Sequence, residues 1–329
     1  MYFPNPHPAD AAGRRPLAAV TGATGFIGRQ LVDTLAQAGW RVRLLLRREP
    51  AGAQWRRSHP EVVAGSMASE AALARLVDGA DAVIHLAGLI KAARRADFFE
   101  VNATGAERLA RTVARVAPGA HFVQVSSLAA RQPALSDYAA SKRAGEDAVR
   151  DVLGARSTVL RPPVVYGPGD RETLRFFQVA RWRRVPLLGP ADTRFALIHV
   201  ADAASLITAL AAAPPTGAVL CAADGRPQGH GWEGLLGAAA RAVGNRAPTF
   251  FQAPRSLLRG VALVGDVARL AGSASMLNSQ KLRELQHPDW AVAPAERALP
   301  PGWSPLHDID SGFADAVRWY RGAGWLPAS

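Results

Sequence analysis

Cysteine is almost absent from the sequence, with Cys221 the only one in 329 residues. A single cysteine cannot form a disulfide within the chain, and this usage fits a reducing compartment, so we expect a cytoplasmic protein. No run of 18 or more apolar residues occurs, so we expect no membrane-spanning helix and no integral membrane association. Residues 1–15 lack an apolar segment, and we interpret them as a flexible tail and not as a signal peptide.

Lysine and acidic residues are also scarce. Only three of the 39 basic residues are lysines, and the 27 acidic residues leave a net charge of +12. Such an excess suits nucleic acid, an acidic membrane surface or an anionic ligand. The arginines are spread along the chain without a basic tail or an aromatic-interleaved patch, so we expect an anionic cofactor and no nucleic acid. No cluster of histidine, cysteine and acidic residues has ligand spacing, and no metal is expected.

The stretch Leu17–Gly28 combines an apolar run of strand length with a glycine-rich turn and the start of a helix. Its glycines, Gly22, Gly25 and Gly28, are spaced by three residues. A strand that turns into a helix in this way presents free backbone N–H groups and the positive end of the helix dipole to a diphosphate. A glycine-rich turn without a ligand is the alternative, but the strand and the helix provide the context that dinucleotide binding requires.

Strand and helix patterns alternate from Leu17 through Arg161. This alternation predicts an α/β fold with a doubly wound, mostly parallel sheet. Beyond Asp224 the pattern loosens, and we expect a smaller, mostly helical C-terminal substrate lobe. The predicted division assigns residues 16–166 and about 194–223 to a dinucleotide-binding domain, and about 167–193 and 224–329 to the lobe.

The octapeptide T-G-A-T-G-F-I-G at residues 21–28 resembles the cofactor turn of the extended short-chain dehydrogenase/reductases. The sequence D-A-V-I-H-L-A-G at residues 81–88 and the later S-S and Y-A-A-S-K motifs are similar to the same group. The likeness covers about Leu17 to Asp202. It implies a Rossmann fold, membership of the NAD-dependent epimerase/dehydratase family and a nicotinamide cofactor.

The resemblance implies which residues contact the cofactor. They lie in the glycine turn, at the end of the fourth strand, in the active-site helix and in the loop after the sixth strand: Gly22, Thr24, Gly25, Phe26, Ile27, Gly28, Leu86, Ala87, Gly88, Tyr138, Lys142, Pro162 and Val165. The resemblance also implies that Ser66 and Met67 contact the adenine, at a place where extended members usually carry an acid.

The second strand ends at Arg47 with no acid before it. An acid at this place would bind the ribose 2′-hydroxyl of NAD, whereas arginine suits the 2′-phosphate of NADP. The sequence therefore favours NADP over NAD. The alternative is that Arg47 is a solvated loop residue in an arginine-rich protein.

Tyr138 and Lys142 are four residues apart on a predicted helix, which places both on one face. A neighbouring ammonium favours the phenolate and lowers the pKa of a tyrosine, so Tyr138 can serve as acid and base during hydride transfer. Ser127, at the end of the preceding strand, would orient the reacting oxygen. The resemblance adds Asn102, which props the active site through the helix backbone. A chance surface pair is the alternative for Tyr138 and Lys142.

Two departures from the family pattern bear on the substrate. Nucleotide-sugar epimerases and dehydratases usually carry asparagine where this chain has Val164, and dehydratases carry acids where it has Leu128 and Ala129. Both departures count against a dehydratase and weaken an epimerase interpretation. Arg194 stands where some relatives bind an anionic part of the substrate, and a structural ion pair is its alternative role. Ser127, Val164 and Arg194 are the predicted substrate contacts.

The favoured hypothesis is an NADP-dependent oxidoreductase that acts on a small or medium apolar carbonyl or secondary alcohol. A nucleotide-sugar epimerase that retains NAD and a non-catalytic NADP-binding sensor or assembly subunit are the alternatives. A homodimer is a family expectation. The basic, amphipathic segment 254–271 either lies on a membrane surface or, as we favour, packs against the active-site cleft.

Overall fold

The computed structural model describes residues 14–48, 55, 58–270, 278–297 and 299–328. The predicted tail therefore lies almost entirely outside the described residues. The chain forms two compact units. The first comprises the described residues of Met1–Arg161 with Ala203–Leu220 and Ala298–Trp303, and the second comprises those of Pro162–Asp202, Cys221–Arg297 and Ser304–Ser329.

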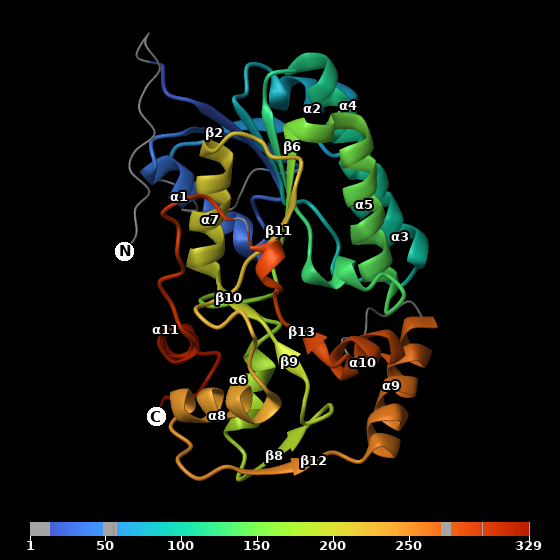
Figure 1. Cartoon of the computed structure of the whole chain (residues 1–329), viewed down its shortest axis with the longest axis vertical. Helices are drawn as coiled ribbons and strands as arrows, with labels where there is room; N and C mark the ends of the chain where they lie inside the picture. The colour runs from blue at the N-terminus through green and yellow to red at the C-terminus, as the bar shows by residue number, and fades with distance from the viewer. Residues whose placement is uncertain (1–13, 49–54, 56–57, 271–277, 298, 329) are drawn as a thin grey trace. The chain divides into compact units, whose positions relative to one another are not determined.

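A seven-stranded sheet forms the centre of the first unit (Figure 1). Its strands are β1 (Leu17–Thr21), β2 (Arg41–Leu46), β3 (Glu61–Ala64), β4 (Ala82–His85), β5 (His121–Val125), β6 (Ser157–Arg161) and β11 (Val219–Cys221). Their order is β11-β6-β5-β4-β1-β2-β3, and the five pairings from β6 to β3 are parallel. Every residue of β1, β4, β5 and β6 is buried, as a parallel sheet covered on both faces requires. The predicted doubly wound sheet is confirmed.

Helices cover both faces of this sheet (Figure 1). The helices α1 (Phe26–Gln37) and α7 (Val200–Ala212) lie on one face, and α2 (Glu70–Val77), α4 (Gly105–Val116) and α5 (Asp137–Leu153) lie on the other.

The apolar stripes of α2, α4 and α5 form one core with the sheet. Leu73, Leu109 and Val149, one from each helix, are fully buried in a cluster that also contains Val83 and Phe122 of the sheet. Burial of side chains of this size stabilises a fold by about 1.5–3 kcal/mol each. This packing fixes the positions of the helices that carry the candidate site.

The second unit contains short strand pairs and helices. Its parallel pairs are β7 (Val164–Tyr166) with β10 (Leu197–His199), β8 (Arg184–Leu187) with β12 (Thr249–Gln252), and β9 (Arg194–Phe195) with β13 (Asp289–Trp290). Its helices are α6 (Leu174–Ala180), α8 (Trp232–Val243), α9 (Arg255–Leu270), α10 (Ser279–Gln286) and α11 (Ile309–Gly322). The mostly helical character expected of the C-terminal region is confirmed, whereas α10 and the short strands were not predicted.

Aromatic side chains form the centre of the second unit. The Phe313 ring meets the rings of Tyr166 and Phe177 edge to face, each with centroids 4.9 Å apart, and Phe177 meets Tyr320 at 5.5 Å. Such pairs add about 0.5–1.5 kcal/mol to the stabilisation that burial of their surface provides.

Among the helices of the described residues, none has the length and apolarity needed to cross a membrane.

Candidate active site

The turn from β1 to α1 is shaped for close approach of a ligand to the backbone. Gly22 has a φ of +75°, and a Cβ added there would lie 2.5 Å from the backbone nitrogen of Ala87. A Cβ at Gly28 would overlap the carbonyl oxygen of Gly22. Gly25 is the N-cap residue of α1 and contributes no side chain, and the first turn of α1 contains no acid. The N-terminal N–H groups of α1 can therefore receive an anion, and the glycine cradle fits a dinucleotide diphosphate.

The end of β4 lies against this turn. The backbone nitrogen of Leu86 donates to the carbonyl of Thr21 at 3.1 Å. The Thr21 hydroxyl is 2.7 Å from Nδ1 of His85. Burial, and then the charge of Lys142, lower the pKa of His85 to about 3, so this imidazole is neutral. His85 therefore packs within the sheet.

Asn102 occupies a π-helical turn, Glu100–Thr104, between α3 (Arg95–Phe99) and α4. The structure shows a continuous helical stretch from Arg95 to Val116 that is interrupted by this turn. A π-turn inserts one residue into a helix and is frequent at functional sites.

The Asn102 amide joins two segments. It accepts from the Leu89 nitrogen at 2.8 Å and donates to the Leu89 carbonyl at 3.0 Å. It also donates to the Ser141 hydroxyl at 2.9 Å, and that hydroxyl donates to the Tyr138 carbonyl at 2.8 Å. A Cβ at Gly145 would overlap the Asn102 carbonyl, so α5 lies directly on the π-turn. Asn102 therefore holds the loop after β4 and the first turns of α5 together.

The ammonium of Lys142 is buried at the same edge of the sheet. Its Nζ donates to the carbonyl of Val125, the last residue of β5, at 2.9 Å. A Cβ added at Gly88 would lie 3.7 Å from this Nζ. Burial lowers the pKa of Lys142 to about 8, and the negative charge of Glu146 partly offsets that shift. No second acceptor is found for Nζ among the described residues, so two of its N–H groups remain for a ligand.

Ser127 and Tyr138 flank the same edge. The Ser127 hydroxyl accepts from the Ala129 nitrogen at 3.2 Å, at the start of a short 3₁₀ turn, Leu128–Arg131. Tyr138 is half-buried in the first turn of α5, and its ring lies 6.3 Å from that of Phe98. The hydroxyl of Ser126 donates instead to the buried carboxylate of Glu146. Ser127, Tyr138, Lys142 and Asn102 thus all belong to the first unit.

Other predicted cofactor positions also lie in the first unit. Arg47 follows β2 directly and is exposed. Ser66 and Met67 follow β3 and are half-buried, and the Met67 carbonyl accepts from Arg108 at 3.0 Å. Thr24 is exposed in the glycine turn. These side chains surround the carboxyl ends of β1, β2 and β3, the edge at which doubly wound folds bind ligands.

The remaining predicted contacts lie in the second unit. Pro162 is buried, Val164 is 41% exposed, and Val165 is half-buried. Arg194 is exposed in β9, and its side chain forms no ion pair with any described residue. The structural ion pair that the sequence left open for Arg194 is therefore not found in the part of the chain that is described.

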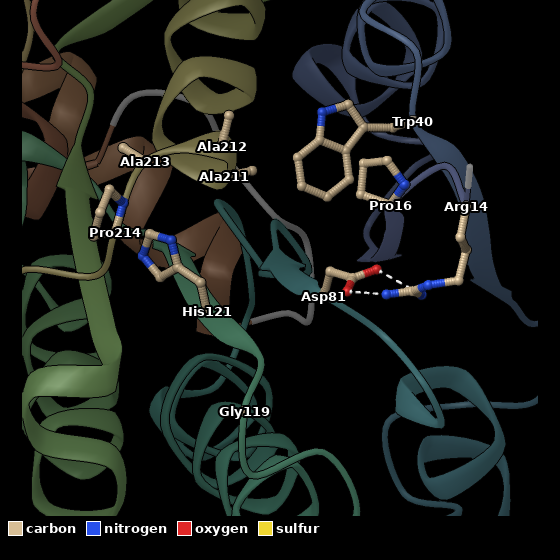
Figure 2. A pocket seen from close by; sticks show the side chains of 10 residues that line it. All are labelled: Arg14, Pro16, Trp40, Asp81, Gly119, His121, Ala211, Ala212, Ala213 and Pro214. Carbon is tan, nitrogen blue, oxygen red and sulfur yellow. Dashed lines mark hydrogen bonds and ion pairs between the residues drawn. The ribbon is translucent and has the colours of Figure 1, made fainter. Parts of the chain in front are cut away.

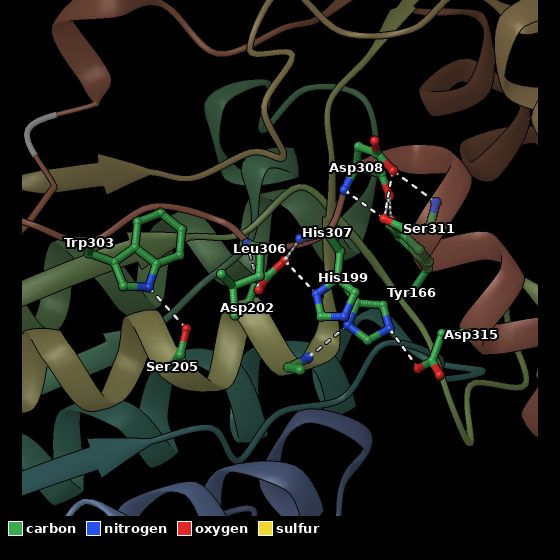
Figure 3. Close-up of polar contacts among 11 residues, drawn as sticks. Tyr166, His199, Asp202, Ser205, Trp303, Leu306, His307, Asp308, Ser311 and Asp315 are labelled. Carbon is green, nitrogen blue, oxygen red and sulfur yellow. Dashed lines mark hydrogen bonds and ion pairs between the residues drawn. The ribbon is translucent and has the colours of Figure 1, made fainter. Parts of the chain in front are cut away.

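A histidine cluster in the second unit was missed by sequence reasoning. The ligand atoms of His199, Asp202 and His307 lie within 4.8 Å of one another. Figure 3 shows the two imidazole rings stacked beside the carboxylate. Their centroids are 3.9 Å apart and their planes are inclined by 29°. Asp202 accepts from the backbone nitrogens of Leu306 and His307 and from the His307 ring. Because the two rings are nearly parallel, their nitrogen lone pairs do not converge on one point, and the cluster is poorly shaped for a single ion. Its hydrogen bonds connect Asp202 of α7 to the segment that precedes α11.

A depression of about 360 Å³ lies at the opposite edge of the sheet (Figure 2). It is lined by Pro16 and His121 beside the amino ends of β1 and β5, and Arg14 pairs there with Asp81 at 2.8 Å. Dinucleotides bind at the carboxyl ends of the strands, so this depression is not the candidate site.

One parallel sheet carries the glycine turn after β1, Ser127 just beyond β5, and Tyr138 and Lys142 on α5. This order is that of the extended short-chain dehydrogenase/reductases. The sequence model of the NAD dependent epimerase/dehydratase family matches residues 18–220. The chain belongs to this family.

Individual relatives agree with that class. The chain is 45% identical over 318 residues to the ceramide reductase of Caulobacter vibrioides, and the match covers 96% of this chain and 98% of the relative. It is 27% identical over 227 residues to the 4-hydroxy-2-methyl-3-oxo-4-farnesyl-3,4-dihydroquinoline-1-oxide ketoreductase of Stigmatella aurantiaca, with 63% of this chain and 68% of the relative covered. The crystal structure of gox2253 shares the fold at a TM-score of 0.74 and 18% identity, over 95% of this chain and 100% of that one. The chain is an NAD(P)-dependent oxidoreductase.

Proposed function

We propose that this enzyme reduces a ketone on a lipid of the ceramide class to the secondary alcohol, with NADPH as reductant. The observation that carries the proposal is the 45% identity to a ceramide reductase across 96% of the chain. The ketoreductase relative is also named for a molecule with a long hydrocarbon group, the farnesyl chain. Ceramides are N-acylated amino alcohols with a secondary hydroxyl, and the ketone at that carbon is the substrate that hydride transfer would convert into it.

Tyr138 is the proposed proton donor in this reaction. A bound nicotinamide would supply the hydride to the carbonyl carbon. The Tyr138 hydroxyl would give its proton to the carbonyl oxygen, and the positive charge of Lys142 would stabilise the phenolate left behind. The Ser127 hydroxyl would hold the oxygen in position. Asn102 acts through other groups, because its amide fixes α5 and the loop after β4, and it is a positioning residue.

The cofactor is proposed to rest on the glycine cradle with its nicotinamide ribose at Lys142. The exposed Arg47 would pair with the 2′-phosphate, which is why we propose NADP over NAD. The other proposed cofactor contacts are Thr24, Phe26, Ile27, Ser66, Met67, Leu86, Ala87, Gly88, Pro162 and Val165. Val164 and Arg194 are proposed to contact the substrate together with Ser127.

The test uses the purified full chain with a synthetic N-acyl-3-ketosphinganine in detergent micelles. We expect oxidation of NADPH at 340 nm and a ceramide-class product by mass spectrometry. Tyr138→Phe should lower kcat by about 10²–10⁴-fold, the range typical of a lost general acid. Trp182→Gln, which changes a side chain that is 56% exposed, is the control and should leave turnover unchanged. Tightly retained NAD with turnover of a nucleotide sugar, and none of the ketolipid, would overturn the proposal in favour of an epimerase.

A further inference from the structure

The helix α9 presents an apolar side that no described residue covers. Five of its side chains are exposed, between 45% and 70%: Leu257, Val261, Leu263, Val264 and Val267. At 3.6 residues per turn they form one continuous side of the helix. Contiguous apolar surface of this kind marks an interaction site.

The opposite side of α9 anchors the helix to its own unit. Leu258 and Ala262 are 6% and 1% exposed and pack in a small cluster with Ala253 and Leu282. The Asp266 carboxylate accepts from the backbone nitrogen and the hydroxyl of Ser279. The core therefore uses one side of α9, and no described residue covers the other side. The five exposed side chains take no part in that cluster.

The charges on α9 favour an anionic partner. Arg255 and Arg259 are both exposed. Arg259 is one turn before Leu263 and borders the apolar side, whereas Arg255 lies in the first turn of the helix on the side of Ala262. Asp266 is the only acid in Arg255–Val267, and Ser279 engages it. A second copy of this helix would offer these arginines no free carboxylate, whereas an anionic bilayer offers phosphates to them and hydrocarbon to the apolar side.

We infer that the exposed side of α9 docks the enzyme on the surface of an anionic lipid bilayer. Helices of this type lie in the interface with the apolar side inserted about 5–10 Å. The biological reason for docking rests on the proposed function, because a ceramide-class ketone resides in a membrane and not in water. The physical case for docking rests on the exposed side chains and arginines of α9 alone.

Vesicle flotation tests the inference without any turnover. The full chain is mixed with vesicles of phosphatidylcholine alone or of phosphatidylcholine with phosphatidylglycerol. We expect flotation with the anionic vesicles and less with the neutral ones. Leu257→Gln/Val264→Gln and Arg255→Gln/Arg259→Gln should each weaken binding to the anionic vesicles by about tenfold or more.

Two matched controls place the effect on α9. Trp182→Gln removes an apolar side chain that is 56% exposed elsewhere, and Arg150→Gln removes an exposed arginine from α5. Both should float as the parent does. Circular dichroism and turnover of a ketolipid in micelles should be unchanged in all four variants, which shows that they are folded.

The outcomes separate docking from the proposed reaction. A parent chain that stays unbound, or α9 variants that float as the parent does, would overturn the inference even if the ketolipid is reduced. A dimer that Leu257→Gln/Val264→Gln converts to a monomer, without lipid binding, would also overturn it in favour of a self-contact. Flotation that depends on α9, with no reduction of the ketolipid, would support docking and reject the proposed reaction.

Discussion

The buried carboxylate of Glu146 forms a bidentate ion pair with the guanidinium of Arg161, with nitrogen–oxygen distances of 2.9 and 2.5 Å. Glu146 lies on α5, one turn after Lys142, and Arg161 ends β6. Because Ser126, directly after β5, donates to the same carboxylate, this single group joins the helix to the ends of two strands. The helix that carries Tyr138 is thereby fixed against the sheet edge.

Glu146→Gln should destabilise the fold strongly. It removes the negative charge that pairs with the buried guanidinium of Arg161, and breaking a buried pair in this way costs about 3–5 kcal/mol. Urea unfolding followed by circular dichroism measures the change. Asp147→Asn is the matched control, because Asp147 pairs with Arg143 on the exposed side of the same helix and such pairs contribute about 0–1 kcal/mol. Equal losses in the two variants would contradict the assigned role.

Asn102→Ala should reduce kcat more than it raises KM. It removes the buried hydrogen bond to Ser141, at a cost of about 1–3 kcal/mol, and it leaves the partly buried nitrogen and carbonyl of Leu89 unpaired, at a smaller cost. Steady-state kinetics with the ketolipid, together with urea unfolding, separate positioning from folding. Ser141→Ala removes one of the three bonds and should have a smaller effect on kcat. A variant that loses stability but keeps the parent kcat would limit Asn102 to a structural role.

Gly22→Ala should abolish binding of the dinucleotide. The new Cβ would meet the backbone of Ala87 at 2.5 Å, and the site must distort to accept it. Gly79→Ala is the control, because Gly79 also has a positive φ, +66°, but open space around its Cβ position. Alanine at Gly79 carries only the left-handed backbone penalty, about 1–2 kcal/mol, and should leave NADPH affinity unchanged. Fluorescence titration with NADPH gives both dissociation constants. A Gly22→Ala chain that binds NADPH as tightly as the parent would contradict the proposed role of the glycine turn in binding the diphosphate.

The sheet and the glycine turn could be predicted because their signals are local. Leu17–Val20 is apolar throughout, as burial on both faces of a parallel sheet demands, and the three glycines lie within seven residues. The π-turn at Asn102 could not be predicted, because one inserted residue leaves the apolar period of a long helix almost unchanged. The role of His307 was hidden for another reason, since its partner Asp202 is 105 residues away in the chain.

The second unit shows where periodicity fails. The short helix α10 contains Lys281, Arg283 and Glu284 and has only a narrow apolar stripe, so no helix was predicted there. The pattern of α9 correctly indicated an amphipathic helix, but periodicity does not tell which apolar side the core takes. A cytoplasmic location and a homodimer stay predictions.

The reductase should lose activity as the pH rises above about 8. Burial lowers the pKa of Lys142 to about 8 from its ordinary value of 10.5, so the ammonium is present below that pH and is lost above it. The proposed stabilisation of the Tyr138 phenolate needs the ammonium, and kcat/KM for NADPH should therefore fall on the alkaline side. Lys142→Arg keeps a positive charge at all accessible pH, so its kcat/KM should be lower but should not fall above about pH 8. If kcat/KM of Lys142→Arg still falls in that range, another group causes the decrease.

The same lysine has the opposite effect on folding. Since the unfolded chain binds the proton up to about pH 10.5 and the folded chain only to about 8, stability contributed by this group rises between those values. Unfolding by urea at pH 8 and at pH 10, compared with Lys142→Met, isolates the contribution. A parent chain whose stability relative to Lys142→Met falls over this window would contradict the direction of the pKa shift.

Arg47 should decide between the two nicotinamide cofactors. Its guanidinium is exposed directly after β2, where a 2′-phosphate would lie, and it can form a bidentate pair with that group. Arg47→Ser should weaken NADPH binding by about tenfold or more, because a charge-assisted hydrogen bond contributes about 1.5–3 kcal/mol, and should leave NADH affinity unchanged. Arg48→Ser, at the neighbouring exposed arginine, is the control for the loss of one positive charge. Equal effects of Arg47→Ser on NADPH and NADH would show that Arg47 supplies only general attraction, and tighter parent binding of NADH would reverse the proposed preference.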